Sequence, residues 1–263
     1  MNESSVAASF HSAQAAYDRG SPDTAISIVS ELISRSRKEP EVPALVLLGH
    51  ALLGVGRHID AADAFEKASL IAPIDDEARI ALATCYARLD RVELARELFL
   101  QLALPRTLPS DLMLKVAQGL ASIDAVRLAM QVCEWVTDRE PTLAQAYYDL
   151  GVYSALLGNP LYLTEAQTRR ALELEPKNVR FRVGLAVVLI QLDQREEALG
   201  LLEELNDSEI QALNCQSCAE KVADFLKAAG RGPLANSFES QGKVLAALKT
   251  PRTPSHLSIK GAR

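Results

Sequence analysis

Residues 45–73 read LVLLGHALLGVGRHIDAADAFEKASLIAP, and this stretch decides the fold. Leu48 and Leu52 lie four residues apart, a spacing that places both side chains on one face of an α-helix. The glycines of the GVGR segment permit a reversal of the chain. Ala61 and Phe65 then mark the face of a second helix, and a proline closes the unit because proline cannot continue a helix interior. The stretch therefore predicts a pair of antiparallel helices.

The same pattern recurs every 34 residues. Shifting Leu48-Gly49 by this period gives Leu82-Ala83, and a second shift gives Val116-Ala117. Self-similarity at such a period indicates an array of small supersecondary units. The small residue in each copy lets the partner helix approach closely, and neighbouring pairs must stack to bury their apolar faces.

These residues resemble tetratricopeptide repeats, whose pattern of Leu-Gly, an aromatic residue, an alanine, a Phe and a late proline is matched best at 48–73. The resemblance implies an all-α fold, a right-handed α-solenoid of stacked antiparallel helix pairs. The family's tryptophan is missing from every unit, and a helical solenoid of another type is the alternative. Seven units are expected in residues 1–249, at about 6–39, 42–75, 76–109, 110–143, 144–178, 179–212 and 216–249. The fifth carries one extra residue near 158–160.

The last helix of the array is expected to cap the stack. One apolar stripe runs through Leu234, Phe238, Leu245 and Leu248, which leaves the opposite face polar. Residues 250–263 are expected to be a disordered basic tail, because they contain little apolar content and no acid.

The charge of the chain argues against nucleic acid as a partner. The net charge is −6, from 28 basic and 34 acidic residues. The last fifteen residues hold four of the cations and no acid, which leaves 24 cations against 34 acids, or −10, in the body. Affinity for nucleic acid depends largely on cationic neutralisation of phosphates, so a protein partner is expected instead.

Targeting and redox signals are weak. The N-terminal MNESSVAASF lacks the basic and long apolar regions of a secretory signal, and no apolar stretch is long enough to span a membrane. Four scattered cysteines in a chain of this size favour a reducing, cytoplasmic setting.

The resemblance to tetratricopeptide proteins implies that the first helix of each pair lines a concave face and meets the ligand there. The inward positions are unusually apolar, and an exposed apolar strip normally marks an interaction site. The candidate partner-binding residues are Val46, His50, Leu53, Ile80, Thr84, Leu114, Gln118, Tyr148, Val152, Val183, Val187 and Ile190. We expect them to bind a peptide or an amphipathic helix of another protein. The alternative is that many of them are half-buried between adjacent first helices.

Some proteins of this family clamp the C-terminal carboxylate of heat-shock chaperones with lysine and asparagine on consecutive inward turns. Here the matching positions hold His50, Thr84 and Gln118. Val46, Ile80 and Leu114 stand in place of the cations. We therefore expect no carboxylate clamp.

Catalysis and cofactors have little support in the sequence. The four histidines are far apart and lack a partnered nucleophile. Cys215 and Cys218 have a metal-like or redox-like spacing, but a zinc site needs about four ligands and no second pair exists. A dithiol site would lie at a strand-to-helix junction, and no strand is expected. The pair is interpreted as two ordinary cysteines at a helix start, where a thiolate is mildly favoured.

The leading hypothesis is a non-enzymatic interaction scaffold or adaptor without a cofactor. A chaperone for an apolar segment of an exported or assembling client would use the same surface. Two further alternatives are a regulatory subunit of an enzyme complex and an autoinhibited protein whose basic tail lies across its acidic body.

Overall fold

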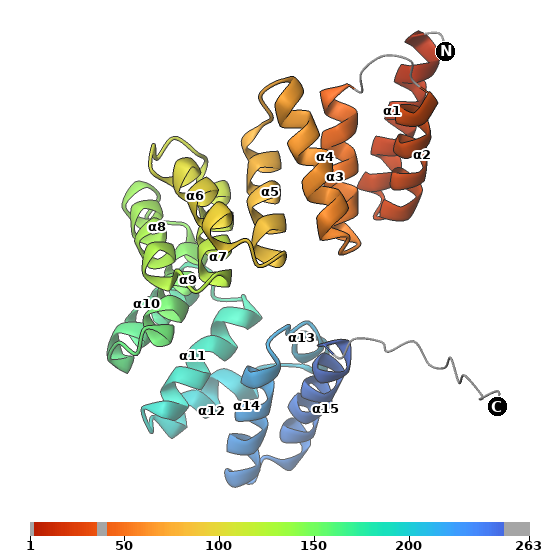
Figure 1. Ribbon diagram of the computed structural model, residues 1–263. Coiled ribbons are helices and arrows are strands. Elements are labelled where there is room, and N and C mark those ends of the chain that lie inside the picture. The colour runs from red at the N-terminus through yellow and green to blue at the C-terminus, as the bar shows by residue number, and fades with distance from the viewer. Residues whose placement is uncertain (1–2, 36–40, 250–263) are drawn as a thin grey trace, which may run out of the picture. The chain divides into compact units, whose positions relative to one another are not determined.

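The computed structural model describes residues 3–35 and 41–249, and this part of the chain is helical without strands (Figure 1). The first nine helices are α1 (Glu3–Asp18), α2 (Pro22–Arg35), α3 (Val42–Gly54), α4 (His58–Ile71), α5 (Asp76–Arg88), α6 (Val92–Ala103), α7 (Ser110–Ser122), α8 (Val126–Arg139) and α9 (Ala144–Leu156). The remaining six are α10 (Leu161–Leu174), α11 (Val179–Gln191), α12 (Arg195–Glu203), α13 (Asp207–Gln211), α14 (Gln216–Ala228) and α15 (Gly232–Lys249).

The helices follow the predicted repeats closely. Helices α3, α5, α7, α9, α11 and α14 begin at the residues where the second to seventh units were expected to begin. Each is followed by a second helix, so the prediction of about seven helix pairs in an all-α solenoid fold is confirmed. The proposed tail, 250–263, lies outside the described residues.

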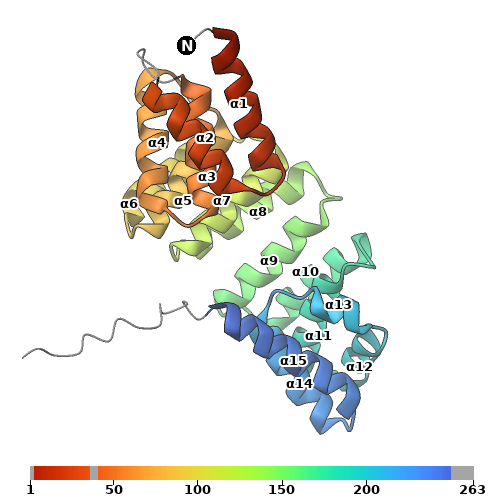
Figure 2. The same cartoon turned by 90° about the vertical axis from the view of Figure 1, so that its right-hand side faces the viewer.

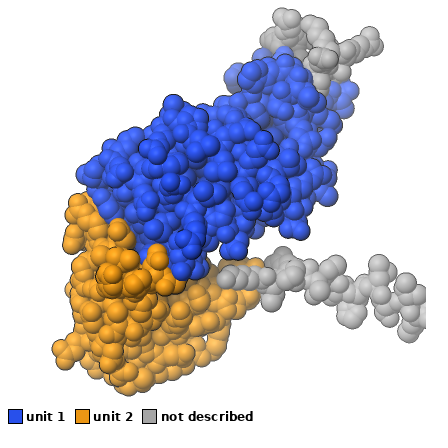
Figure 3. Space-filling model, turned by 60° about the vertical axis from the view of Figure 1, so that its left-hand side comes forward, with its two compact units in different colours: residues 1–157 blue, residues 158–263 orange. Residues whose placement is uncertain are grey.

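The chain divides into two compact units, residues 1–157 and 158–263, hereafter unit 1 and unit 2 (Figure 3). The boundary falls where the sequence pattern carries its extra residue, within the fifth expected repeat. Helix α9 therefore belongs to unit 1 and α10 to unit 2.

The turn between the two helices of a pair depends on one residue with positive φ. These residues are Gly20, Gly56, Asp90, Asp124, Gly158, Asp193 and Gly230, with φ between 58° and 78°. Glycine enters this left-handed region without a steric cost, and aspartate tolerates it better than most other residues. At Asp90, the next amide, of Arg91, donates to the carbonyl of Tyr86 at 2.9 Å. The six-residue hydrogen bond closes the C-terminus of the first helix, as in a Schellman motif.

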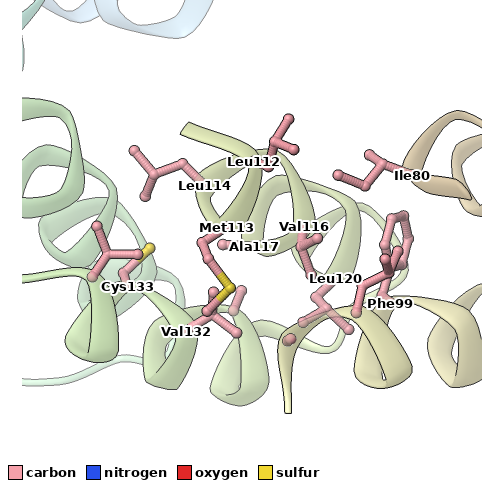
Figure 4. Close-up of a cluster of buried hydrophobic side chains, with 14 of the residues drawn as sticks. Ile80, Phe99, Leu112, Met113, Leu114, Val116, Ala117, Leu120, Val132 and Cys133 are labelled. Carbon is pink, nitrogen blue, oxygen red and sulfur yellow. The ribbon is translucent and has the colours of Figure 1, made fainter. Parts of the chain in front are cut away.

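The largest core cluster of unit 1 is centred on α7. Leu112, Met113, Leu114, Val116 and Leu120 are all buried in it. Figure 4 shows the α7 side chains between Ile80 and Phe99 from the preceding pair and Val132 and Cys133 from α8. The first helix of a pair thus packs against its own second helix and against the pair before it.

Unit 2 contains one helix that the period does not predict. The second helix of the sixth pair, α12, ends after nine residues, and the short α13 follows it. Asn206 accepts from the amide of Glu209, whose carboxylate accepts in return from the Asn206 amide. This capping box begins α13 because it satisfies two amides that a helix start otherwise leaves unpaired.

The final helix packs on α14, and Figure 2 shows the two side by side. Phe238 is fully buried and Leu234 and Leu245 are half-buried, as the predicted apolar stripe requires. The prediction fails at Leu248, which is 77% exposed. Leu248 lies in the last turn of α15, and the helix pairing that buries Phe238 does not cover it.

The interpretation of Cys215 and Cys218 as two ordinary cysteines at a helix start is wrong. Their sulfur atoms are joined in a disulfide, and their Cα atoms are 5.3 Å apart. The helical start brings residues three apart onto one face, which places the two side chains within bonding reach. Cys85 and Cys133 are free and buried.

Candidate functional site

One hollow of unit 1 is lined by the first helices of four successive pairs. It has a volume of about 960 Å³, and α1, α3, α5 and α7 all contribute side chains to it. We call it the α1–α7 groove. Its apolar lining includes Val46 and Leu53 of α3, Ile80 of α5 and Ile74, which precedes α5. An apolar floor of this kind can hold apolar side chains of a ligand.

The groove brings together six of the twelve residues proposed from the sequence. These are Val46, His50, Leu53, Ile80, Thr84 and Gln118. Gln118 also lines a second hollow of about 530 Å³, together with Leu114. These seven positions belong to α3, α5 and α7, where the 34-residue period aligns without slippage.

The other five proposed residues lie outside these two hollows. Tyr148 and Val152 are on α9, where Tyr148 is buried and Val152 is half-buried against the core. Val183, Val187 and Ile190 are on α11 in unit 2, where Val183 is 2% exposed. Their side chains pack in or against the core of unit 2.

Even within the hollows, burial differs sharply among the proposed residues. Ile80 and Leu114 are only 6% and 5% exposed, whereas Val46 and Leu53 are half-buried and Gln118 is exposed. Figure 4 shows Ile80 of α5 and Leu114 of α7 in the core cluster. Ile80 therefore forms part of the floor, and the accessible contacts come from the half-buried and polar positions.

Sequence reasoning missed the contribution of α1. Phe10, Gln14 and Tyr17 line the groove and precede Val46, His50 and Leu53 by 36 residues each. The strict 34-residue period does not identify them, because the spacing between the first and second pairs is 36 residues, two more than the period. A search for the same three-position pattern at a variable offset would have found them.

Charged groups at the groove are balanced and partly paired. Its lining contains two acidic residues, Asp75 and Glu77, and two basic ones, Arg88 and Lys115. Lys115 of α7 donates to Glu77 of α5 at 3.0 Å, and Asp75 caps α5 by accepting from the amide of Ala78 at 2.8 Å. An exposed ion pair contributes little to stability. This one links α5 and α7, the first helices of two adjacent helix pairs. The groove thus has no strong net charge.

Burial of His50 in the groove wall favours its neutral imidazole. Its ring packs edge-on against the ring of Phe65, with centroids 5.1 Å apart. Burial lowers the pKa of His50 below its ordinary value, while Asp75 and Glu77 act in the opposite direction. Lowering prevails because burial penalises the charged imidazolium more than the two carboxylates favour it.

The neutral state of His50 predicts a pH dependence of stability. Below the ordinary pKa of 6.5 the unfolded chain takes up a proton at His50 before the folded chain does. The free energy of unfolding of unit 1 should therefore fall as the pH is lowered from about 7.5 to about 5. His50→Gln should flatten this slope relative to wild type, measured by urea unfolding at each pH. The matched control is His11→Gln, at an exposed position of the same unit, and an equal flattening by both variants would contradict the assignment to His50.

Other kinds of site find no support in the part of the chain that the structure describes. Across residues 3–35 and 41–249, no group of three or more histidine, cysteine or acidic side chains is placed to hold a metal ion. In the same ranges, no helix combines the length and the apolar character needed to cross a bilayer.

Comparisons with known proteins agree with this architecture. Two family models, both described as tetratricopeptide repeat, match residues 52–108 and 179–204. No curated protein matches the sequence.

Solved structures resemble the chain in fold. A tetratricopeptide repeat protein from Parabacteroides merdae has a TM-score of 0.71 and 13% identity, covering 94% of this chain and 95% of that one. PilF of Pseudomonas aeruginosa has a TM-score of 0.58 and 17% identity, covering 78% and 92%. YrrB, described as a TPR protein with an unusual peptide-binding site, has a TM-score of 0.52 and 16% identity, covering 71% and 90%.

The repeat period, the helix pairs that start at its phase and the matching family models all lead to one assignment. The chain contains tetratricopeptide repeats, matched at residues 52–108 and 179–204, within a fold of about seven helix pairs.

Proposed function

We propose that this protein is a non-enzymatic scaffold that binds a peptide or helix of another protein in the α1–α7 groove. Tetratricopeptide repeats generally mediate protein–protein interaction, and YrrB is a similar structure described as having a peptide-binding site. The observation that carries the proposal is the lining of one hollow by four successive first helices. Such a lining offers a row of equivalent positions to an elongated ligand.

The chemistry of the groove favours a partner segment with spaced apolar side chains. Val46 and Leu53 present partly exposed apolar surface, and Thr84 and Gln118 provide polar contacts beside it. The hydroxyl of Thr84 donates to the carbonyl of Ile80 at 2.8 Å, which leaves its oxygen able to accept from a ligand. Burial lowers the pKa of His50 and so disfavours a positive charge in the groove. An amphipathic helix laid in the groove would match these features.

A displayed library of random peptides provides the probe for this proposal. Wild type should select peptides with apolar residues at helical spacing. The double variant Leu53→Glu with Thr84→Glu should weaken the selected peptides by about tenfold or more, because each carboxylate would have to be desolvated beneath an apolar ligand. Binding is measured by fluorescence anisotropy of a labelled selected peptide.

The matched control is Ile59→Glu with Leu94→Glu. It makes the same change in charge within unit 1, at side chains that are 70% and 47% exposed and outside both hollows. The control should bind within about twofold of wild type. Helical content by circular dichroism checks the fold of both variants. A folded groove variant that binds the selected peptides like wild type would refute the groove as the binding site.

A further inference from the structure

We propose that Cys215 and Cys218 form a reversible thiol–disulfide exchange site at the start of α14, with low-molecular-weight thiols and disulfides of the glutathione type as co-reactants. The site lies in unit 2, whereas the α1–α7 groove lies in unit 1. Three features carry the proposal: the bonded pair, its position at a helix start, and the contrast with the other two cysteines.

The pair lies where a reagent in solution can reach it. Both cysteines are half-buried, and Ser217 between them is exposed. Cys215 is the N-cap residue of α14, and the backbone amide of Cys218 donates to its sulfur at 3.3 Å. The hydroxyl of Ser217 lies 3.6 Å from the same sulfur. Both of these polar contacts converge on Cys215 Sγ.

This arrangement determines which sulfur of the pair is attacked and which one leaves. A thiolate at Cys215 would be stabilised by the Cys218 amide and by the positive end of the α14 dipole. In exchange reactions the more stable thiolate is the better leaving group. The incoming thiolate should therefore attack Cys218 Sγ, and Cys215 should leave.

The exchange balances with two molecules of thiol. In the first step a glutathione thiolate forms a bond to Cys218 Sγ, the bond between Cys215 and Cys218 breaks, and Cys215 departs as a thiolate. In the second step another glutathione thiolate attacks the glutathione sulfur of this mixed disulfide, which yields oxidised glutathione and a Cys218 thiolate. The two protein thiolates take up the two protons that the attacking thiols released. The protein disulfide is reduced and two thiols are oxidised.

The surrounding fold supports both redox states. Gln241 of α15 donates to the carbonyls of Gln211 at 3.0 Å and Leu213 at 2.6 Å, so the chain entering Cys215 is held without the disulfide. Ala219 and Val222 anchor the first turns of α14 in the core of unit 2. Reduction is therefore a local change at the helix start.

The other two cysteines serve as internal controls. Burial raises the pKa of the Cys85 thiol to about 11, and burial also raises the pKa of Cys133. Both side chains are 0% exposed. A buried thiol that stays protonated is a poor nucleophile, so thiol chemistry on the folded protein should report on the 215–218 pair alone.

The test is a titration of the full chain in glutathione buffers of varied ratio of reduced to oxidised form, quenched with acid and measured by mass spectrometry. The disulfide fraction should follow the buffer ratio while the circular dichroism spectrum is unchanged. The variant Cys85→Ala with Cys133→Ala should give the same curve. A pair that is reduced only when the chain is unfolded in urea would overturn the proposal, and so would a pair that stays as two thiols in excess oxidised glutathione.

Single substitutions test whether Cys215 is the leaving group. Cys218→Ser keeps Cys215 and Cys215→Ser keeps Cys218, and serine remains a good N-cap in the second variant. At pH about 7, iodoacetamide should alkylate Cys215 about tenfold faster than Cys218, as expected for a thiolate favoured at a helix start. Equal rates, or faster alkylation of Cys218, would refute Cys215 as the leaving group.

Discussion

Gly119→Ala is expected to destabilise unit 1 by about 1–3 kcal/mol, a typical cost of overpacking a dense core. A Cβ at Gly119 would meet the ring of Phe99, with Cε1 at 2.5 Å and Cε2 at 2.7 Å. Phe99 is 0% exposed and belongs to the preceding helix pair, so a shift of its ring would disturb the packing of the core. Urea unfolding followed by the fluorescence of Trp135, the one tryptophan of the sequence, measures the effect in the same core cluster.

The matched control is Gly54→Ala, in the last turn of α3. A Cβ there would meet no atom within 4 Å, so alanine should be neutral or stabilise by up to about 1 kcal/mol through its better helix propensity. Adding Phe99→Leu to Gly119→Ala should restore part of the loss, since leucine is smaller than the ring it replaces. Equal stability of Gly119→Ala and Gly54→Ala would contradict the prediction, because it would mean that the core accommodates a methyl group at residue 119.

Phe238→Ala is expected to lower the free energy of unfolding of unit 2 by about 3–5 kcal/mol, the usual cost of removing a buried aromatic ring. Phe238 is 0% exposed and is among the largest fully buried side chains of the described residues. It lies on α15 and belongs to the core cluster that α11, α12 and α14 also form. Its loss would leave a cavity where the last helix meets the array.

The control on the same helix is Leu248→Ala. Leu248 is 77% exposed, so truncating it should change stability by less than about 0.5 kcal/mol. Urea unfolding followed by far-ultraviolet circular dichroism measures both variants. A small effect of Phe238→Ala would mean that unit 2 is stable without the packing of α15, contrary to the role of a terminal cap.

Helix starts could be predicted from the sequence because they depend on local patterns. Apolar residues at helical spacing and the 34-residue period located the beginnings of α3, α5 and α7. The turns were predictable only in part. Gly56 was recognised as a turn residue, whereas Asp90 and Asp124 hold the same positive φ without a glycine. Their role appears only when the closing hydrogen bond from the next amide is seen.

The candidate site was harder to predict because exposure depends on neighbouring pairs. Val46 and Ile80 are equivalent in the repeat, yet Val46 is half-buried and Ile80 lies in the core cluster around α7. The sequence period gives both residues the same place on their helices. How much of each is exposed depends on the side chains that the next pair brings against it.

The sequence by itself determined the helix pairs, their order and the face that each helix buries, since these follow from residues a few positions apart. Only the tertiary structure decided that α1 joins the groove, that Phe99 fills the space above Gly119 and that Cys215 bonds to Cys218. The physical reason is that packing space and bonding reach depend on atoms brought together by the fold, which a repeat period does not encode.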